Sequence, residues 1–399
     1  MNKLTIDDIQ LKDKRCLVRV DFNVPMESGR VVDDNRIVES LPTIKKLLDS
    51  GGRVILMSHL GRPKGKRNPE YSLQPVATHL TKLLGEPVKF APDCIGEEVK
   101  KMVNTLAGDE CLLLENLRFH QEEERNDQHF SQELALLGDL YVNDAFGTAH
   151  RAHASTEGVT HFLQPAVAGY LMKKELEYLS RAVINPVRPY VAILGGAKIS
   201  GKIEIIQNLM NKVDALLIGG GMMFTFFKAQ GLDIGGSLLE ADKVDLGAKI
   251  LKDAQKRNIK LLLPVDCVVA DKFENSANRK TVPVMQIPKG WMGLDIGQES
   301  VRLFREELHK ARTVVWNGPM GVFEMDNFAS GTIAIAKMLA DLTKNGTITI
   351  VGGGDSAAAL AKIGLEKSVS HISTGGGASL EFLEGKILPG VAALTDRQN

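Results

Sequence analysis

Residues 347–377 combine two glycine clusters with a carboxylate, a combination suited to holding a phosphate group. β-branched residues alternate over 347–351, and the run GGGDS follows at 352–356; a second strand pattern at 369–374 ends in GGG at 375–377. Both runs predict a strand, a turn and a helix start. Glycine lets the backbone approach an anion closely, and a helix start offers unpaired N–H groups and the positive end of the helix dipole.

Asp355 lies in the first of these glycine turns. A carboxylate among amides that cradle phosphate would repel the anion unless it also holds a cation, which indicates Mg²⁺. The alternative interpretation is that Asp355 only caps the helix that follows.

A second phosphate-binding candidate is the run GAKISGKI at 196–203, which follows a predicted strand. It matches the P-loop pattern through its lysine but has Ile203 where a serine or threonine would bind Mg²⁺. What remains is Lys198 and Lys202 beside a glycine turn, four residues apart and on one helical face if the helix has begun. Point charges of this kind suit phosphate.

The pattern Gly352-x-Gly354-x-x-Ala357 also matches a dinucleotide-binding fingerprint. That fingerprint needs an acidic residue near the end of the next strand to hold a ribose, and glycines stand there instead. A nicotinamide-binding site is therefore disfavoured. Glu324, just beyond another predicted strand, could accept hydrogen bonds from ribose hydroxyls or pair with a lysine.

The first half of the chain carries cationic loops after its predicted strands. In the strand expected over 16–24, Arg19, Asp21 and Asn23 share one face, which either binds a ligand or meets solvent. Residues 51–69 hold five Lys/Arg and no acid, after a strand end where α/β ligand sites lie. A solvated basic loop is the alternative.

Three further arginines are candidates for binding an anion. Arg36 stands at the start of a predicted helix over 35–49, a poor place for a cation, which favours a role outside the helix. Arg118 lies in an acid-rich segment and could simply be paired there. Arg151 stands between His150 and His153, which lack partners at metal-ligand spacing, so an anion-binding loop is favoured there.

Composition bounds the class of protein. The 399 residues are 44% hydrophobic and 25% charged, with zero formal net charge and 5% aromatics, which disfavours nucleic-acid binding and attraction to membranes. The four cysteines are far apart and form no CxxC pair, so a reducing compartment is expected. Without a signal peptide or an apolar run of about 18 residues, a soluble cytoplasmic protein is expected.

Strands and helices alternate in two series, which predicts an α/β protein with two parallel-sheet domains. A helical pattern at 171–183 and the linker NPVRP at 185–189 separate the series. The second series has expected strands at 190–195, 214–218, 260–263, 313–316, 347–351 and 369–373.

With these residues in view, the chain closely resembles the phosphoglycerate kinase family over essentially its whole length. The runs that carry the resemblance are KRCLVRVDFNVP at 14–25, SHLGRP at 58–63, ENLRF at 115–119, NDAFGTAHR at 143–151, GGAKISGK at 195–202, WNGPMGVFE at 316–324, GGGDS at 352–356 and STGGG at 373–377. Any one of these runs is weak evidence for the resemblance, but all of them in this order are very specific to the family.

The resemblance implies reversible phosphoryl transfer from ATP to the carboxylate of 3-phosphoglycerate, giving ADP and 1,3-bisphosphoglycerate. It assigns the acid substrate to Asp21, Asn23, Arg36, His59, Arg62, Arg118 and Arg151. It assigns the nucleotide to Lys202, Glu324, Gly353, Gly354, Asp355 and Ser356, with Gly219 and Gly220 beside the adenine and Asp355 orienting Mg²⁺. It places Arg36, Lys198, Lys202, Gly353 and Gly376 around the phosphoryl group in flight.

The implied architecture has two Rossmann-like domains joined by a hinge helix. Residues 1–170 would bind phosphoglycerate, 171–189 form the helix and linker, 190–376 bind nucleotide, and 377–399 return to the first domain. Hinge closure would align the substrates for direct in-line transfer and exclude water. A cytoplasmic monomer without nucleic-acid or membrane partners is expected. The rival classes are a nicotinamide dehydrogenase and a non-catalytic nucleotide-binding protein.

Overall fold

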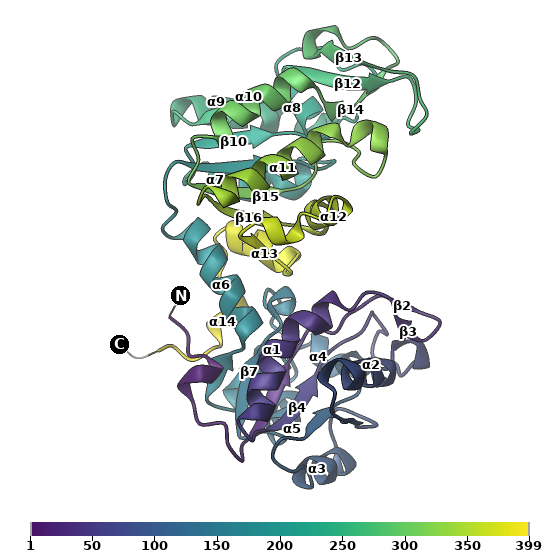
Figure 1. Cartoon of the computed structure of the whole chain (residues 1–399), viewed down its shortest axis with the longest axis vertical. Coiled ribbons are helices and arrows are strands. Elements are labelled where there is room, and N and C mark those ends of the chain that lie inside the picture. The colour runs from purple at the N-terminus through teal and green to yellow at the C-terminus, as the bar shows by residue number, and fades with distance from the viewer. Residues whose placement is uncertain (1, 398–399) are drawn as a thin grey trace. The chain divides into compact units, whose positions relative to one another are not determined.

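Short aliphatic runs form a six-stranded parallel sheet in each of two units of the chain (Figure 1). The computed structural model describes residues 2–397, so the first residue and the last two of the expected domains lie outside the described part. The first unit comprises the residues up to Glu177 together with those from Ile387 onward, and the second unit comprises Tyr178–Lys386.

The first sheet has the strand order β5-β6-β4-β1-β7-β8, with every pair parallel. Its strands are β1 (Arg15–Arg19), β4 (Arg53–Met57), β5 (Val88–Phe90), β6 (Cys111–Leu113), β7 (Leu140–Asn143) and β8 (Ala166–Ala168). A hairpin pairs β2 (Met26–Glu27) with β3 (Arg30–Val31). The helices are α1 (Asn35–Asp49), α2 (Gln74–Leu84), α3 (Glu97–Asn104), α4 (Gln121–Glu124), α5 (Gln128–Ala135), the first part of α6 (Tyr170–Val183), and α14 (Pro389–Ala392). Short 3₁₀ turns are η1 (Ile6–Asp8), η2 (Pro69–Tyr71), η3 (Leu117–Phe119), η4 (Phe146–Thr148) and η5 (Gly158–His161).

Alternation along the strands builds the core of the first unit. Cys16 and Val18 of β1 belong to the same buried cluster as Ile37 and Ile44 of α1. Leu17, between them, is also fully buried and points to the other face of the sheet. A parallel sheet is covered on both faces, so its strands are apolar on both sides and only their ends are free for polar loops.

The second sheet has the order β11-β10-β9-β15-β16-β17, again with every pair parallel. Its strands are β9 (Tyr190–Leu194), β10 (Ala215–Ile218), β11 (Lys260–Leu262), β15 (Thr313–Asn317), β16 (Ile348–Gly352) and β17 (His371–Ile372). The helices are α7 (Ile203–Leu209), α8 (Met223–Ala229), α9 (Val244–Lys256), α10 (Gln298–Leu308), α11 (Ser330–Lys344), α12 (Gly354–Lys362) and α13 (Gly377–Leu383). The 3₁₀ turns are η6 (Ser200–Lys202), η7 (Ala241–Lys243), η8 (Val284–Gln286), η9 (Asp326–Phe328) and η10 (Glu366–Ser368).

A three-stranded antiparallel sheet in the second unit adds to the parallel sheets expected from the sequence. Its order is β13-β12-β14, with β12 (Asp266–Ala270), β13 (Arg279–Pro283) and β14 (Met292–Ile296). β13 is mostly exposed and lacks the apolar alternation that predicts a strand. Its pairing with the buried β12 therefore arises from tertiary structure.

The C-terminal segment returns to the first unit, as the resemblance implied. Thr395 N donates to Ala166 O at 2.8 Å and Leu4 N donates to Thr395 O at 2.9 Å, so the segment is hydrogen-bonded both to β8 and to the first residues. The second unit extends to Lys386 because α13 packs against α7. Among the described helices, none is long and apolar enough to cross a membrane.

Candidate active site

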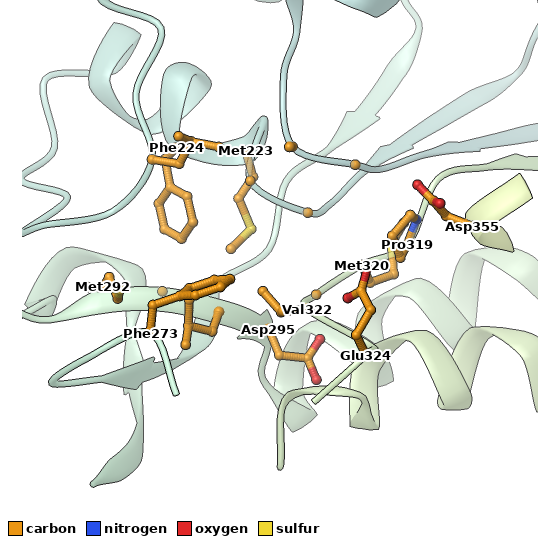
Figure 2. Close-up of a pocket in the computed structure, with 18 of the residues that line it drawn as sticks. Met223, Phe224, Phe273, Met292, Asp295, Pro319, Met320, Val322, Glu324 and Asp355 are labelled. Atoms are coloured by element: carbon orange, nitrogen blue, oxygen red, sulfur yellow. The ribbon is translucent and has the colours of Figure 1, made fainter. Parts of the chain in front are cut away.

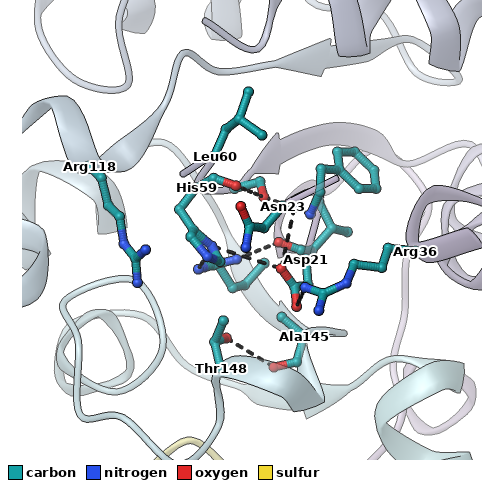
Figure 3. Close-up of polar contacts among 12 residues, drawn as sticks. Asp21, Asn23, Arg36, His59, Leu60, Arg118, Ala145 and Thr148 are labelled. Carbon is teal, nitrogen blue, oxygen red and sulfur yellow. Dashed lines mark hydrogen bonds and ion pairs between the residues drawn. The ribbon is translucent and has the colours of Figure 1, made fainter. Parts of the chain in front are cut away.

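Polar side chains gather in the first unit where its central strands end. Asp21 and Asn23 follow β1, His59 follows β4, and Arg118 lies in η3 after β6. Parallel strands end at the same edge of a sheet, which brings these loops together. Figure 3 shows Arg36 and Arg118 approaching from opposite sides, with His59, Asp21 and Asn23 between them.

An ion pair positions Arg36. Its Nη1 lies 2.6 Å from Asp21 Oδ2, and 41% of the Arg36 side chain remains exposed against 11% of Asp21. Arg36 stands in the first turn of α1, where the helix dipole disfavours a cation, and the carboxylate of Asp21 offsets that cost. Asp21 therefore fixes the position of the Arg36 guanidinium.

Asn23 and Arg118 hold the loop that follows β4. Asn23 Oδ1 accepts a hydrogen bond from Gly61 N at 2.8 Å, and Arg118 Nη1 donates to Gly61 O at 2.9 Å. Arg118 is 5% exposed, and its Nε lies 3.3 Å from Glu124 Oε1. The pairing that the acid-rich segment suggested is present, yet it leaves the guanidinium facing the same loop as His59.

Arg62 and Arg151 complete the set of candidate anion ligands. Arg62 is exposed, and within the described residues no ion pair or hydrogen bond holds its side chain. Arg151 Nε donates to His150 Nε2 at 3.2 Å. Arg151 is also close enough to His59 for its charge to act on the imidazole.

His59 is neutral in this surrounding. Burial lowers the pKa of His59 well below its ordinary value, and the positive charges of Arg19, Arg118, Arg36 and Arg151 lower it further. The positive charge of the site therefore rests on arginine, which matches the planar oxygens of carboxylate and phosphate. The arrangement suits a small anion with more than one acidic group.

The prediction that Arg19, Asp21 and Asn23 share one face of a single strand is wrong. β1 ends at Arg19. Val20 N still bonds Met57 O, and the chain then turns so that Val24 N bonds Phe22 O. Arg19 is 1% exposed and points into the protein, whereas Asp21 and Asn23 lie in the loop.

A cavity of about 500 Å³ opens in the second unit at the carboxyl end of its sheet (Figure 2). Apolar side chains from α8, the antiparallel sheet and the loop after β15 line most of it; they include Met223, Phe224, Leu238, Phe273, Met292, Leu294 and Val322. Glu324 and Asp355 line it with carboxylates. An apolar cleft with a few polar groups at one end suits a heterocycle that carries a polar tail.

Gly219 and Gly220, the glycines predicted to lie beside the adenine, allow the loops beneath the cavity to pack closely. Gly220 has φ +66°, and a Cβ there would lie 2.5 Å from Gly196 N and 2.8 Å from Pro319 O. A Cβ on Gly219 would lie 2.5 Å from Met320 Sδ. Gly220 lines the cavity, whereas Gly219 supports it from behind.

The GGGDS run forms the predicted strand, turn and helix start. Gly353 has φ +88° and precedes α12, whose first turn contains Asp355. Gly354 and Asp355 are exposed at this helix start. Ser356 Oγ accepts a hydrogen bond from Gly318 N at 2.7 Å, so its hydroxyl serves the fold and only its backbone faces the helix start.

Lys202 is held at the same edge, whereas Lys198 is exposed in the loop before it. Lys202 Nζ donates to Asn317 Oδ1, and burial lowers the pKa of Lys202 to about 8 although Asp355 raises it. α7 begins only at Ile203, so the condition for placing the two lysines on one helical face, a helix that has already begun at Lys198, is not met.

Two buried polar residues of the second unit were missed by the sequence reasoning, and one of them, Asp295, lines the cavity. Asn317 is 2% exposed at the end of β15; among residues 2–397 its Nδ2 has no hydrogen-bond partner, and a Cβ on Gly353 would lie 3.1 Å from this nitrogen. Asp295 is 1% exposed and accepts from Gly331 N at 2.8 Å, and burial raises its pKa to about 7. Their positions at strand ends were the available signal.

Gly376 lies at the start of α13 with φ +50°, the backbone turn that the STGGG run predicted. Its neighbour Gly375 donates through N to Ser373 Oγ at 3.3 Å. The structure places Gly376 at a helix start in the second unit, whereas Arg36, the one arginine of the predicted catalytic set, lies in the first.

Asp355 stands without a cluster of protein metal ligands. Within residues 2–397, the one group of three potential ligands is Asp93, Cys94 and His120 in the first unit, where His120 Nε2 already lies 2.7 Å from Asp93 Oδ1. Mg²⁺ is commonly held by one or two carboxylates together with substrate phosphates. Asp355, beside a glycine-rich helix start, fits that kind of site.

Comparison with known proteins places these features in a family. The family model described as phosphoglycerate kinase matches residues 6–386. Curated phosphoglycerate kinases from Chloroherpeton thalassium and Chlorobaculum tepidum are 62% and 60% identical to the chain, each covering 99% of it and 100% of the relative.

Solved structures agree with the sequence relatives. Phosphoglycerate kinase from Coxiella burnetii matches with a TM-score of 0.90 at 42% identity, and that from Pyrococcus horikoshii with 0.84 at 33%; both matches cover 98% of each chain. The two-unit α/β fold and the sequence identity together establish that the chain belongs to the phosphoglycerate kinase family.

Proposed function

We propose that this chain catalyses reversible phosphoryl transfer between ATP and the carboxylate of 3-phosphoglycerate, giving ADP and 1,3-bisphosphoglycerate. The observation that carries the proposal is the pairing of two unlike sites in one family fold. One is an arginine-rich anion site around the neutral His59, and the other is an apolar cavity lined by the carboxylates of Glu324 and Asp355, with Lys202 close enough to Asp355 for their charges to interact.

The anion site would hold phosphoglycerate by its two acidic ends. Arg36 is held by Asp21 and half-exposed, so its guanidinium is presented to the substrate. Arg62, Arg118 and Arg151 would neutralise phosphate oxygens, while His59 and Asn23 contribute neutral polar contacts and fix the loop.

The cavity would hold the nucleotide. Its apolar walls suit the base, Glu324 could accept hydrogen bonds from ribose hydroxyls, and Lys202 with the amides from Gly353 to Ser356 would hold the phosphates. Asp355 would hold Mg²⁺ together with phosphate oxygens. Bound there, the ion would supply charge neutralisation on the phosphates.

The chemistry needs positioning and charge neutralisation more than acid–base catalysis. A carboxylate acceptor is already ionised at neutral pH, so no general base is required. Direct transfer between two bound substrates also needs no nucleophilic side chain. Arg36, Lys198, Lys202 and the amides at Gly353 and Gly376 would surround the moving phosphoryl group after hinge closure, which also excludes water.

We also infer a monomeric cytoplasmic enzyme. The four cysteines Cys16, Cys94, Cys111 and Cys267 are free and buried, which supports a reducing compartment. The monomeric state rests on the family resemblance.

The direct test is ADP release from Mg·ATP with and without 3-phosphoglycerate, in the presence of hydroxylamine. Hydroxylamine converts an acyl phosphate into a hydroxamate. We expect ADP release that depends on the acid and matches the hydroxamate formed. ADP release without the acid would indicate an ATPase, and binding of nucleotide without turnover would indicate a non-catalytic binding protein. NADH binding would revive the dehydrogenase alternative.

A further inference from the structure

Arg19 is a buried arginine beside the anion site, and its guanidinium contacts only protein groups among the described residues. It is 1% exposed at the end of β1. Its Nε donates to Ser155 Oγ at 2.8 Å, its Nη1 donates to Val20 O, and its Nη2 lies 3.1 Å from His59 Nδ1. All three nitrogens are thus occupied inside the protein.

A buried carboxylate lies at the far end of this contact. Ser155 Oγ donates to Glu123 Oε1 at 2.6 Å, and Ser155 N donates to Glu123 Oε2 at 2.9 Å. Glu123 and Ser155 are both fully buried. Ser155 is fixed from another side because its carbonyl oxygen accepts from Tyr141 Oη at 2.9 Å. Glu123, Ser155, Arg19 and His59 therefore form one continuous hydrogen-bonded chain.

This hydrogen-bonded network of Glu123, Ser155, Arg19 and His59 fixes which nitrogen of His59 carries the proton. A guanidinium has N–H donors and no acceptor, so the ring nitrogen facing Arg19 must accept. Nδ1 is that nitrogen, since Arg19 Nη2 lies 3.1 Å from it, whereas the acceptor Asp21 Oδ1 lies 3.9 Å from it, beyond hydrogen-bond distance. In a neutral imidazole the proton then resides on Nε2. Nε2–H is a donor, which is the correct polarity towards the oxygens of an anion. The other tautomer would turn a lone pair on Nε2 towards those oxygens.

We propose that Glu123, Ser155 and Arg19 are positioning residues that hold His59 as the neutral Nε2–H tautomer, so that it donates a hydrogen bond to the acid substrate. The identity of that substrate rests on the proposed function, whereas the tautomer is a property of the free protein. Glu123 balances the charge of Arg19 through Ser155, so a buried cation can stand next to His59. Arg19 thereby acts through His59 and not on the ligand.

The first experiment is nitrogen-15 NMR of the histidine side chains in the full-length protein at neutral pH. The His59 signal is assigned by its loss in His59→Gln. We expect an unprotonated Nδ1 and a protonated Nε2 in the wild type, and a change in the Nε2 environment when 3-phosphoglycerate is added. A protonated Nδ1, or a doubly protonated ring, would overturn the proposal whatever the activity of the enzyme.

The second experiment removes the Ser155 hydroxyl, which connects Glu123 to Arg19. Ser155→Ala should give a mixture of His59 tautomers and raise KM for 3-phosphoglycerate about 10-fold, the loss of roughly one hydrogen bond to a charged group, with kcat little changed. Ser155→Thr keeps the hydroxyl and should restore both properties. Arg19→Lys keeps the charge without the fixed geometry of the guanidinium and should also mix the tautomers.

Ser131→Ala is the matched control. Ser131 is likewise a buried serine of the first unit, and its Oγ donates to Asp127 O at 2.7 Å. It is not part of the hydrogen-bonded network that reaches His59. It should lower stability without altering the His59 tautomer or KM. If Ser155→Ala and Ser131→Ala lower stability alike and His59 stays purely Nε2–H in both, the hydrogen-bonded network of Glu123, Ser155, Arg19 and His59 has only a structural role and the proposal is wrong. Absence of phosphoglycerate binding alongside the expected tautomer would instead overturn the substrate assignment.

Discussion

At Lys202 two physical effects oppose each other. Burial disfavours the ammonium and brings its pKa down to about 8, while Asp355 favours it. A lysine of this kind is charged at pH 7 but is incompletely solvated, so a phosphoryl group that gains charge on its oxygens would replace missing solvent. Its interaction should therefore strengthen between the bound substrate and the transition state.

Lys202→Ala should lower kcat by about 100- to 1,000-fold, because it removes a fixed cation from the moving phosphoryl group. Steady-state kinetics with both substrates varied would measure it. Lys337→Ala, which removes an exposed lysine of α11, serves as the control and should leave kcat unchanged. An effect of Lys202→Ala that is confined to KM would assign Lys202 to ground-state binding.

The same lysine should make the plot of kcat/KM against pH fall on its alkaline side. Because the pKa of Lys202 is lowered to about 8, the free enzyme loses this charge as pH rises through 8, and kcat/KM for the nucleotide should fall there. Lys202→Arg keeps its charge at higher pH and should remove that fall while lowering the rate at neutral pH. An unchanged fall in Lys202→Arg would show that another group titrates.

Only part of the anion site could be predicted from the residues themselves, because the strand-end argument was available for the cationic loop at 51–69 alone. Asp21, His59 and Arg118 are assigned to one site by the family resemblance, and the structure brings them to one edge of the sheet. The apolar walls of the cavity could not be predicted in this way. Phe224 and Phe273 are typical core residues in sequence, and only the tertiary structure shows that they line a cavity.

Helix α6 illustrates how an element is fixed by a residue far away in sequence. Its first backbone N–H groups donate to side chains of the first unit: Tyr170 N to Thr43 Oγ1 at 2.8 Å, and Leu171 N to Asp144 Oδ1 at 2.9 Å. The sequence predicted this helix from its periodicity, but its capping groups lie on α1 and after β7. A cap supplied by another element leaves no local signal.

Asp144 should make stability depend on pH. Burial raises its pKa to about 7 from the ordinary 3.8, so the folded state binds more protons in that interval and stability falls as pH rises through it. Asp144→Asn keeps an acceptor for Leu171 N but cannot ionise, so it should reduce the loss of thermal stability between pH 5 and 8. Asp295, with a pKa also raised to about 7, retains part of the dependence. Equal pH dependence in variant and wild type would contradict this account.

On the scale of the whole molecule, the two candidate sites belong to different compact units joined by α6. Direct transfer requires the phosphoryl donor and the carboxylate to come within reacting distance, so a hinge movement follows from the proposed chemistry. The two-unit fold was predictable because strand–helix alternation occurs twice. The closure itself has no sequence signal, since it depends on ligands that cross-link two surfaces.

Small-angle scattering should detect that closure. We expect the radius of gyration to decrease when 3-phosphoglycerate and an unreactive ATP analogue with Mg²⁺ are both present, and to change less with either ligand alone. Both ligands are needed because each one contacts only its own unit until the other completes the bridge, so the closed state gains its affinity only from the pair. Replacing Arg36 should weaken this response even at saturating ligand, because Arg36 is the first-unit cation assigned to the moving phosphoryl group. No compaction with both ligands bound would exclude hinge closure as the means of bringing the substrates into line.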